Sequence, residues 1–385
     1  MGSGLARMPS VSLSGPSRWL LAAVFAVLAG CATEWSPPPL TAPLSPTEAR
    51  ALISRLIPAN VPDRSGWARD IYAAMTTLDV PVTPEYACSV VAITDQESNF
   101  RVDPAVPNLS SIAWKEIEKQ RERVGVPKLV VQGALLLPSS NGKSYSERID
   151  AVKTEKQLSD LFEDFIGMVP MGKTFFAYRN PVRTGGPMQV SVEFAEAHAR
   201  QKPYPYPVNG SIRNEVFSRR GGMYFGIAHL FDYAAPYDSH IYRYADFNAG
   251  HYASRNAAFQ NSVSVLTGVT LTLDGDLLRY ERGQPAAEPG STELATRALG
   301  RRVDMSATEI RRDLELGKSA EFERSRLYTR VFALADKVNG QRVPRAVLPR
   351  IQLQSPKITR KLTTDWFANR VDTRYRSCLA RANDA

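Results

Sequence analysis

The alternation of apolar and polar positions predicts a chain made mainly of helices. Residues 45–48, Ser-Pro-Thr-Glu, have the pattern of a capping box with proline at the first helical position. A helix therefore begins there, and Pro58 ends it. A second helix has apolar residues three or four positions apart, at Trp67, Ile71, Met75 and Leu78.

A third helix is expected from Thr83-Pro84 to about Ser98. On it, four residues follow one another at i, i+4, i+7 and i+11: Tyr86, Val90, Ile93 and Glu97. This spacing places them on one face of the helix, so Glu97 lies on the apolar stripe. A lone carboxylate there is costly unless it borders a polar cleft. The pattern therefore singles out Glu97 as a candidate functional residue.

The remaining pattern predicts further helices around one long interruption. Residues 108–182 have mixed composition and are interpreted as an insertion, in which the apolar stretch 126–138 is of strand or loop type. Residues 269–280 contain a central Asp-Gly, which is typical of a hairpin turn. Other helices are expected at 189–198, at 221–233, from about 242, and after a capping box at 306–309.

Residues 1–30 have the pattern of an export signal. A basic lead is followed by a 12-residue apolar run at 19–30, which is too short to span a bilayer. The run ends in Leu-Ala-Gly before Cys31, which resembles the lipobox of bacterial lipoproteins. The resemblance implies lipidation of Cys31 after cleavage, and Ala32 in place of Asp favours the periplasmic face of the outer membrane. The proline-rich residues 31–46 suit a tether.

Charge and length narrow the class of protein. Loss of the leader with its two arginines lowers the formal net charge from +9 to +7, and the basic residues are scattered rather than gathered in a stripe. In an exported protein the anionic partners are envelope polymers and lipid headgroups, so nucleic acid is set aside. The mature length suits one large domain or two. We predict a first domain at 47–265 and a helical C-terminal extension at 266–385.

The number and spacing of the cysteines and histidines do not indicate a metal site or a cofactor site. Cys88 and Cys378 are compatible either with a disulfide in an oxidising compartment or with two buried free thiols. The four histidines are spread too widely for a metal signature. The stretch 141–144, Asn-Gly-Lys-Ser, lacks the first glycine of a phosphate-binding loop. We therefore predict no metal and no cofactor.

Four short stretches, taken in order, resemble the lytic transglycosylases and goose-type lysozymes. They are QESNF at 96–100, TGGPMQV at 184–190, GGMYFGIAHL at 221–230 and YADFNAG at 244–250. Each stretch alone is weakly specific, and the resemblance covers residues 85–260. It implies a mainly α, lysozyme-like domain that binds peptidoglycan glycan strands. The whole chain also resembles a poorly characterised group of proteobacterial lipoproteins, from which no function is carried over.

The resemblance implies a role for each matching residue. Glu97 is the general acid and base that cleaves the β-1,4 bond between N-acetylmuramic acid and N-acetylglucosamine. Burial among apolar side chains is expected to raise the pKa of Glu97, keeping it protonated near neutral pH. In lytic transglycosylases no second carboxylate is needed, because the C6 hydroxyl of the sugar attacks. The implied substrate-binding residues are Ser98, Gly186, Met188, Gln189, Tyr244, Phe247 and Asn248.

One departure from the family pattern bears on activity. Phe247 stands where members usually carry a tyrosine whose hydroxyl touches the catalytic glutamate. Tyr244, one helical turn earlier, is a candidate to replace it. The alternative interpretation is a non-catalytic envelope lipoprotein that binds glycan or a protein partner through a degenerate cleft.

Overall fold

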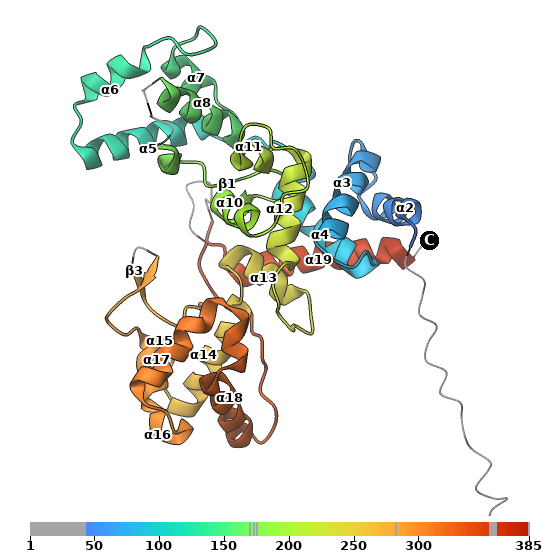
Figure 1. The fold of residues 1–385 in the computed structure, drawn as a ribbon, viewed down its shortest axis with the longest axis vertical. Coiled ribbons are helices and arrows are strands. Elements are labelled where there is room, and N and C mark those ends of the chain that lie inside the picture. The colour runs from blue at the N-terminus through green and yellow to red at the C-terminus, as the bar shows by residue number, and fades with distance from the viewer. Residues whose placement is uncertain are drawn as a thin grey trace, which may run out of the picture. The chain divides into compact units, whose positions relative to one another are not determined.

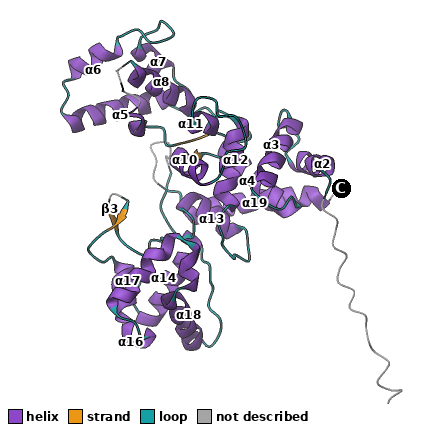
Figure 2. Ribbon diagram, viewed as in Figure 1, coloured by secondary structure: helices purple, strands orange, loops and turns teal. Residues whose placement is uncertain are grey.

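The computed structural model describes residues 44–168, 171, 174, 176–281, 283–353 and 360–383. The predictions for the leader, the tether and Cys31 lie outside these residues. The described part is mainly helical, which confirms the predicted class (Figure 2). In this part, no helix is both long and apolar enough to cross a membrane.

Seven helices of the described chain precede residue 170, and the first three agree with the predicted ones. They are α2 (Pro46–Leu56), α3 (Arg64–Thr77), α4 (Pro84–Ser98), α5 (Leu109–Val124), α6 (Lys128–Leu135), α7 (Tyr145–Ala151) and α8 (Glu155–Gly167). The capping box at Ser45 forms as predicted, with the Glu48 side chain accepting from the Ser45 amide at 2.9 Å. The third predicted helix is confirmed as α4. The strand or loop expected at 126–138 is wrong, because most of this stretch forms α6.

A short hairpin precedes the next group of helices. The segments are η1 (Ala177–Arg179), β1 (Thr184–Gly185), β2 (Val190–Ser191), α10 (Val192–Gln201), α11 (Ile212–Val216), α12 (Arg219–Phe231) and α13 (Ile241–Ala249). Strand β1 pairs antiparallel with β2, with Gly185 opposite Val190. The helix predicted from 189 begins three residues later, because residues 190–191 extend into this strand pair.

The last part of the chain is also helical. Its segments are α14 (Ala253–Thr267), β3 (Tyr280–Glu281), β4 (Gln284–Pro285), α15 (Ser291–Ala298), α16 (Gly300–Val303), α17 (Ala307–Glu315), η2 (Leu316–Lys318), η3 (Ala320–Arg324), α18 (Arg326–Asn339) and α19 (Thr364–Asn383). The capping box predicted at 306–309 forms at the start of α17. The hairpin predicted over 269–280 is wrong. The Gly275 amide and carbonyl bond instead to Gln260 and Asn256 of α14.

Three groups of buried apolar residues stabilise residues 45–385, which form one compact unit. The first core is built by α2, α3, α4, α12, α13 and α19, together with β2 and α10. The second core is built by α14 to α18 and the loops between them. The third core lies among α5 to α8, drawn in green shades in Figure 1, and includes Tyr145 and Ile149.

The cores do not follow the predicted division at residues 265 and 266. Helix α14, assigned to the first domain, contributes Phe259 and Val263 to the second core. Helix α19, assigned to the C-terminal extension, contributes Phe367 and Val371 to the first core and packs along α4. Five buried residues of the predicted insertion form the separate third core, and none of its described buried residues belongs to the first core.

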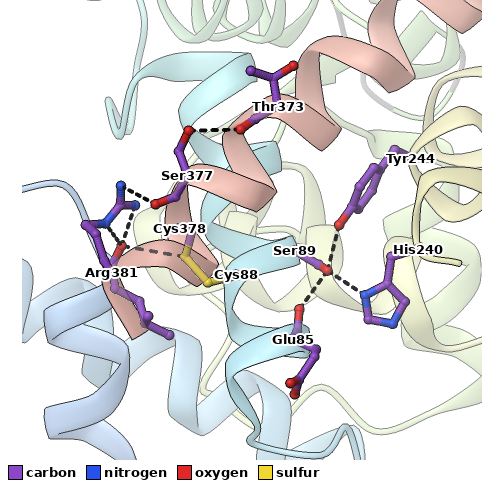
Figure 3. Close-up of a disulfide and its surroundings, with 10 residues drawn as sticks. Glu85, Cys88, Ser89, His240, Tyr244, Thr373, Ser377, Cys378 and Arg381 are labelled. Atoms are coloured by element: carbon purple, nitrogen blue, oxygen red, sulfur yellow. Dashed lines mark hydrogen bonds between the residues drawn. A yellow bond between two sulfur atoms is a disulfide. The ribbon is translucent and has the colours of Figure 1, made fainter. Parts of the chain in front are cut away.

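A disulfide links two helices of the first core that are far apart in the sequence. Cys88 in the middle of α4 is bonded to Cys378 in α19, with 5.5 Å between their Cα atoms (Figure 3). Both cysteines are fully buried. Near Cys378, the Arg381 guanidinium donates two hydrogen bonds to the Leu56 carbonyl at the end of α2. The final helix is therefore linked to α4 by the disulfide and to the end of α2 by hydrogen bonds.

Candidate functional site

The C-terminal end of α4 carries Glu97 on its last turn. Glu97 is half-buried. The helix ends because Asn99 and then Phe100 adopt left-handed backbone, with φ of 49° and 58°. The Phe100 ring is held edge-on against Trp67 of α3, with ring centroids 5.2 Å apart. Positive φ in a bulky residue such as phenylalanine is a rare conformation, so packing must stabilise this reversal.

The side chain of Ser98, a predicted substrate-binding residue, faces its own helix. Ser98 is buried, and its hydroxyl donates to the Thr94 carbonyl at 3.1 Å. Thr94 in turn lies against α12, with its hydroxyl 3.9 Å from the Met223 sulfur. The Ser98 hydroxyl is therefore bonded within α4 and is buried rather than presented to a ligand.

The loop between β1 and β2 holds three predicted substrate-binding residues. Gly186 has φ of +73°, and a Cβ there would lie 2.1 Å from the Val216 carbonyl oxygen, so only glycine fits. Gln189 has φ of 50°, and both its amide and its side-chain Nε2 donate to the Gly186 carbonyl, at 3.1 and 3.2 Å. Gln189 thus closes a tight turn while remaining half-exposed.

Helix α12 supports this loop from behind. Met188 is fully buried, and a Cβ added to Gly226 would lie 2.5 Å from the Met188 sulfur. One turn earlier on α12, a Cβ at Gly222 would lie 2.4 Å from Pro187. The glycines of α12 therefore allow direct contact with the Pro187–Met188 turn. The second and third motif stretches are therefore in contact.

The fourth stretch lies at the end of α13 and contacts His229 of α12. The Phe247 ring packs against His229 with centroids 4.9 Å apart, and the His229 Nε2 lies 3.1 Å from the Phe247 carbonyl oxygen. Asn248, the next residue, is exposed to solvent. Phe247 is buried in the first core, so of these two predicted substrate-binding residues only Asn248 is exposed to solvent at the end of α13.

Tyr244 does not replace the missing tyrosine beside Glu97. Its hydroxyl lies 2.9 Å from the Ser89 hydroxyl, which also bonds to His240 and to the Glu85 carbonyl (Figure 3). Ser89 is eight residues before Glu97 on α4, which corresponds to about 12 Å along the helix axis. Burial raises the pKa of Tyr244, so it stays protonated. The candidate contact between Tyr244 and Glu97 is therefore corrected: Tyr244 belongs to the packing of α4 against α13.

The fourth stretch contains a buried carboxylate that the sequence pattern did not indicate. Asp246 is fully buried and accepts hydrogen bonds from the Tyr237 hydroxyl at 2.7 Å and the Tyr233 hydroxyl at 3.1 Å. It also accepts from the backbone amides of Tyr252 and Ser254, at 2.9 and 2.7 Å. Burial raises the pKa of Asp246, and these donors oppose the rise. The carboxylate fixes the turn between α13 and α14, and no local pattern marked it.

The histidines also serve packing. His229 and His251 stack with ring centroids 4.6 Å apart, and Phe194 lies 4.7 Å from His229. Burial, together with a smaller contribution from the nearby His251, lowers the pKa of His229 to about 3. Among the described residues, no group of three His, Cys, Asp or Glu side chains is placed to hold a metal ion.

A surface pocket lies elsewhere, at the C-terminal end of α14. Its volume is about 520 Å³. Its lining residues are Asn261, Ser264, Val265, Gly268–Leu273 and Arg350. The lining contains one cationic side chain and no carboxylate, so it offers no acid for glycosidic bond cleavage. None of the predicted site residues lines it.

Comparison with known proteins identifies the family of this chain. It is 54% identical over 353 residues to the "Uncharacterized protein YaiW" of Escherichia coli (strain K12), an alignment that covers 92% of this chain and 95% of that protein. No solved structure matches the chain. Residues 60–381 match the family described as "Protein of unknown function (DUF1615)". The chain therefore belongs to the DUF1615 family.

Proposed function

We propose that the protein cleaves the glycan strands of peptidoglycan by lytic transglycosylation, with Glu97 as general acid and base. The strained backbone around two of the four motif stretches carries this proposal. Asn99 and Phe100 follow Glu97 in left-handed conformation, and Gln189 adopts the same conformation in the second stretch. Left-handed backbone costs about 1–3 kcal/mol in bulky residues such as Phe100 and Gln189, and strain of this kind is found at functional sites.

The position of Glu97 suits a proton donor. Its carboxyl lies on the last turn of α4, where the negative end of the helix dipole disfavours an anion. Cleavage begins with a proton transfer from this carboxyl to the bridging glycosidic oxygen. The resulting carboxylate then accepts the proton of the sugar's C6 hydroxyl, whose oxygen attacks C1 and leaves a 1,6-anhydro end. The glutamic acid is thereby regenerated without water or a second carboxylate.

Residues of the other stretches suit sugar binding. The Gln189 amide is half-exposed on a rigid turn and carries both donor and acceptor groups for an N-acetyl group. The exposed Asn248 amide adds the same chemistry from α13. Met188 is fully buried behind the turn, so in this proposal it supports Gln189 rather than touching the sugar.

The test is digestion of purified sacculi, with the products identified by mass spectrometry. Wild-type protein should release fragments with 1,6-anhydro ends. Glu97→Gln keeps the side-chain shape but has no acidic proton, so turnover should fall by a factor of about 10² or more. Glu85→Gln is the matched control, because it makes the same change on the first turn of the same helix. Equal activity in Glu97→Gln and wild type contradicts the role of Glu97.

A second candidate function is binding of glycan without cleavage. It is favoured by the observation that Tyr244 bonds to Ser89 and that Phe247 lacks a hydroxyl. In this case sacculi would retain the protein in a pull-down, and neither wild type nor Glu97→Gln would release products. The Gln189→Ala variant, which removes the exposed amide, should then weaken retention.

We also propose that the protein is anchored to the outer membrane through a lipid on Cys31, which follows the small residues of the leader. Labelled palmitate should be incorporated by the wild type and not by Cys31→Ser. Equal labelling of both proteins contradicts the anchor. This measurement is independent of glycan cleavage.

A further inference from the structure

The surface pocket at the C-terminal end of α14 is not used by the proposed glycan cleavage. Its volume of about 520 Å³ lies within the range of about 300–1,000 Å³ that is typical of pockets for small molecules. The irregular segment 268–273 lies beside α14, where the Leu271 amide donates to the Ser264 hydroxyl at 3.2 Å. The Arg350 amide donates to the Leu273 carbonyl at 2.8 Å. Hydrogen bonds thus hold together the three parts of the chain that build the pocket.

The lining of this pocket includes a cationic side chain that is available to a ligand. Arg350 is exposed, and among the described residues its guanidinium forms neither a hydrogen bond nor an ion pair. The side-chain amide of Asn261, half-buried on α14, likewise has no hydrogen-bond partner in the described chain. Asp274 and Asp276, the nearest acids along the chain, do not line the pocket, and Asp274 bonds to Gln260 at 2.7 Å. A guanidinium in this setting suits a carboxylate, which it binds through two parallel hydrogen bonds.

The end of α14 supplies apolar surface and a hydrogen-bond acceptor to the same pocket. Val265 is 53% exposed and Val269 48%, although both side chains are apolar. The Val265 carbonyl accepts no hydrogen bond from the described residues, because the Val269 amide donates to the Thr267 hydroxyl at 3.2 Å instead. Arg302 bonds to the next carbonyl, that of Leu266. Carbonyls at a helix end carry partial negative charge, which favours an N–H donor and disfavours a dianion such as phosphate.

We propose that this pocket binds a small peptidic carboxylate, which is an N-acyl amino acid or an N-acyl dipeptide with a free C-terminus. The carboxylate bonds to the Arg350 guanidinium, and an amide N–H of the ligand donates to the Val265 carbonyl. A small apolar side chain of the ligand packs on Val265 and Val269, while the Asn261 amide bonds to a peptide group. The cation and the helix end together select a monoanion with an N–H donor over inorganic phosphate. This binding does not depend on the proposed glycan cleavage.

The test is titration of the full-length protein with N-acetyl-alanyl-alanine, followed by isothermal titration calorimetry. Saturable binding of one peptide per chain is expected. The same peptide with a C-terminal amide lacks the carboxylate and should bind more weakly by a factor of about ten or more. Hydrogen–deuterium exchange locates the site, because the bound peptide should slow exchange in residues 264–273 and leave exchange in α4 unchanged.

Variants of Arg350 test whether its side chain makes the contact. Arg350→Gln removes the charge of an exposed side chain and leaves the backbone bond to Leu273, so the affinity should fall by about tenfold or more in a folded protein. Arg350→Lys keeps the charge but not the two parallel hydrogen bonds, so it should give an intermediate affinity. Arg69→Gln, exposed on α3 and outside the lining, is the matched control and should bind like the wild type. Circular dichroism checks that all three variants fold.

Three results would overturn the proposal. The first is the absence of any heat of binding at peptide concentrations up to about 10 mM. The second is equal affinity for the free acid and the amide, or for wild type and Arg350→Gln, which would remove the contact between the carboxylate and Arg350. The third is tighter binding of inorganic phosphate or of propionate than of the peptide, which would assign the pocket to a simple anion without an N–H donor.

Discussion

The segments that build the first core and those that build the second core are held together in different ways. The first core joins helices from both ends of the described chain, and the Cys88–Cys378 disulfide links residues 290 positions apart. The second core is contiguous in sequence, from Ala258 to Val343, and is closed by side chains that bond to nearby loops. A core made from distant segments depends on a covalent link more than a core made from neighbouring helices, because loop-closure entropy grows with the length of the loop.

In the second core, a buried arginine holds separate segments together through hydrogen bonds. Arg255 is 1% exposed and donates to the Gly317 carbonyl at 2.6 Å and to the Ser319 carbonyl at 2.8 Å. Its guanidinium also lies 4.2 Å from the centre of the Tyr252 ring. Asn256, the next residue, donates to the same Gly317 carbonyl at 2.9 Å. Hydrogen bonds from the start of α14 therefore hold the η2 segment in place.

The largest expected effect tests this difference directly. Changing Cys88 and Cys378 together to serine should lower the free energy of unfolding of the first core by about 2–4 kcal/mol. Hydrogen–deuterium exchange should speed up in α4 and α19 and stay unchanged in α14 to α18. Equal loss of protection in both cores would show that the two cores unfold as one unit.

The second expected effect is a difference between the two cores in how their stability depends on pH. The pKa of His229 is lowered to about 3 in the fold, against 6.5 in the unfolded chain. The unfolded state therefore binds the proton first. The stability that His229 contributes is complete above pH 6.5 and is lost as the pH falls from 6.5 towards 3. The loss is up to about 1.4 kcal/mol per pH unit.

The pH effect has a structural basis and a matched control. The His229 Nδ1 is buried without a hydrogen-bond partner, so a proton there has no acceptor. Urea titrations at pH 7 and pH 5 should show a smaller difference in stability for His229→Gln than for wild type. The second core contains no histidine, so His229→Gln should leave its pH dependence unchanged. An unchanged pH slope in His229→Gln would remove His229 as its source.

Local signals in the sequence were sufficient to predict many elements of both cores. The capping boxes before α2 and α17, and the proline at the start of α4, fix helix starts through contacts within three residues. The failures involve long-range contacts. Asp274-Gly275 has the composition of a hairpin turn, but Gln260 and Asn256 of α14 take its backbone hydrogen bonds. The pairing of Cys88 with Cys378 depends on the return of α19, which no local pattern indicates.

The candidate site shows the same limit. The sequence motifs gave no indication that the second and third stretches meet, a contact that the glycines of α12 make possible by allowing close approach. The role of Tyr244 was not predictable in this way. One helical turn separates it from Phe247 in sequence, yet its hydroxyl reaches Ser89, about two turns before Glu97 on α4. Asp246 was missed because its four donors come from three different segments.

The smallest expected effect separates packing from catalysis in the first core. Tyr244→Phe removes the hydroxyl that bonds to Ser89 and keeps the ring beside Tyr375. Loss of one buried hydrogen bond should lower the free energy of unfolding by about 0.5–1.5 kcal/mol. Ser89 keeps its bonds to His240 and to the Glu85 carbonyl, so the penalty should stay at the low end of this range. Glycan cleavage by Tyr244→Phe should equal that of wild type, because the hydroxyl lies about 12 Å along α4 from Glu97. A loss of cleavage as large as that of Glu97→Gln, with unchanged stability, would place the Tyr244 hydroxyl in the catalytic machinery and require α13 to move when glycan binds.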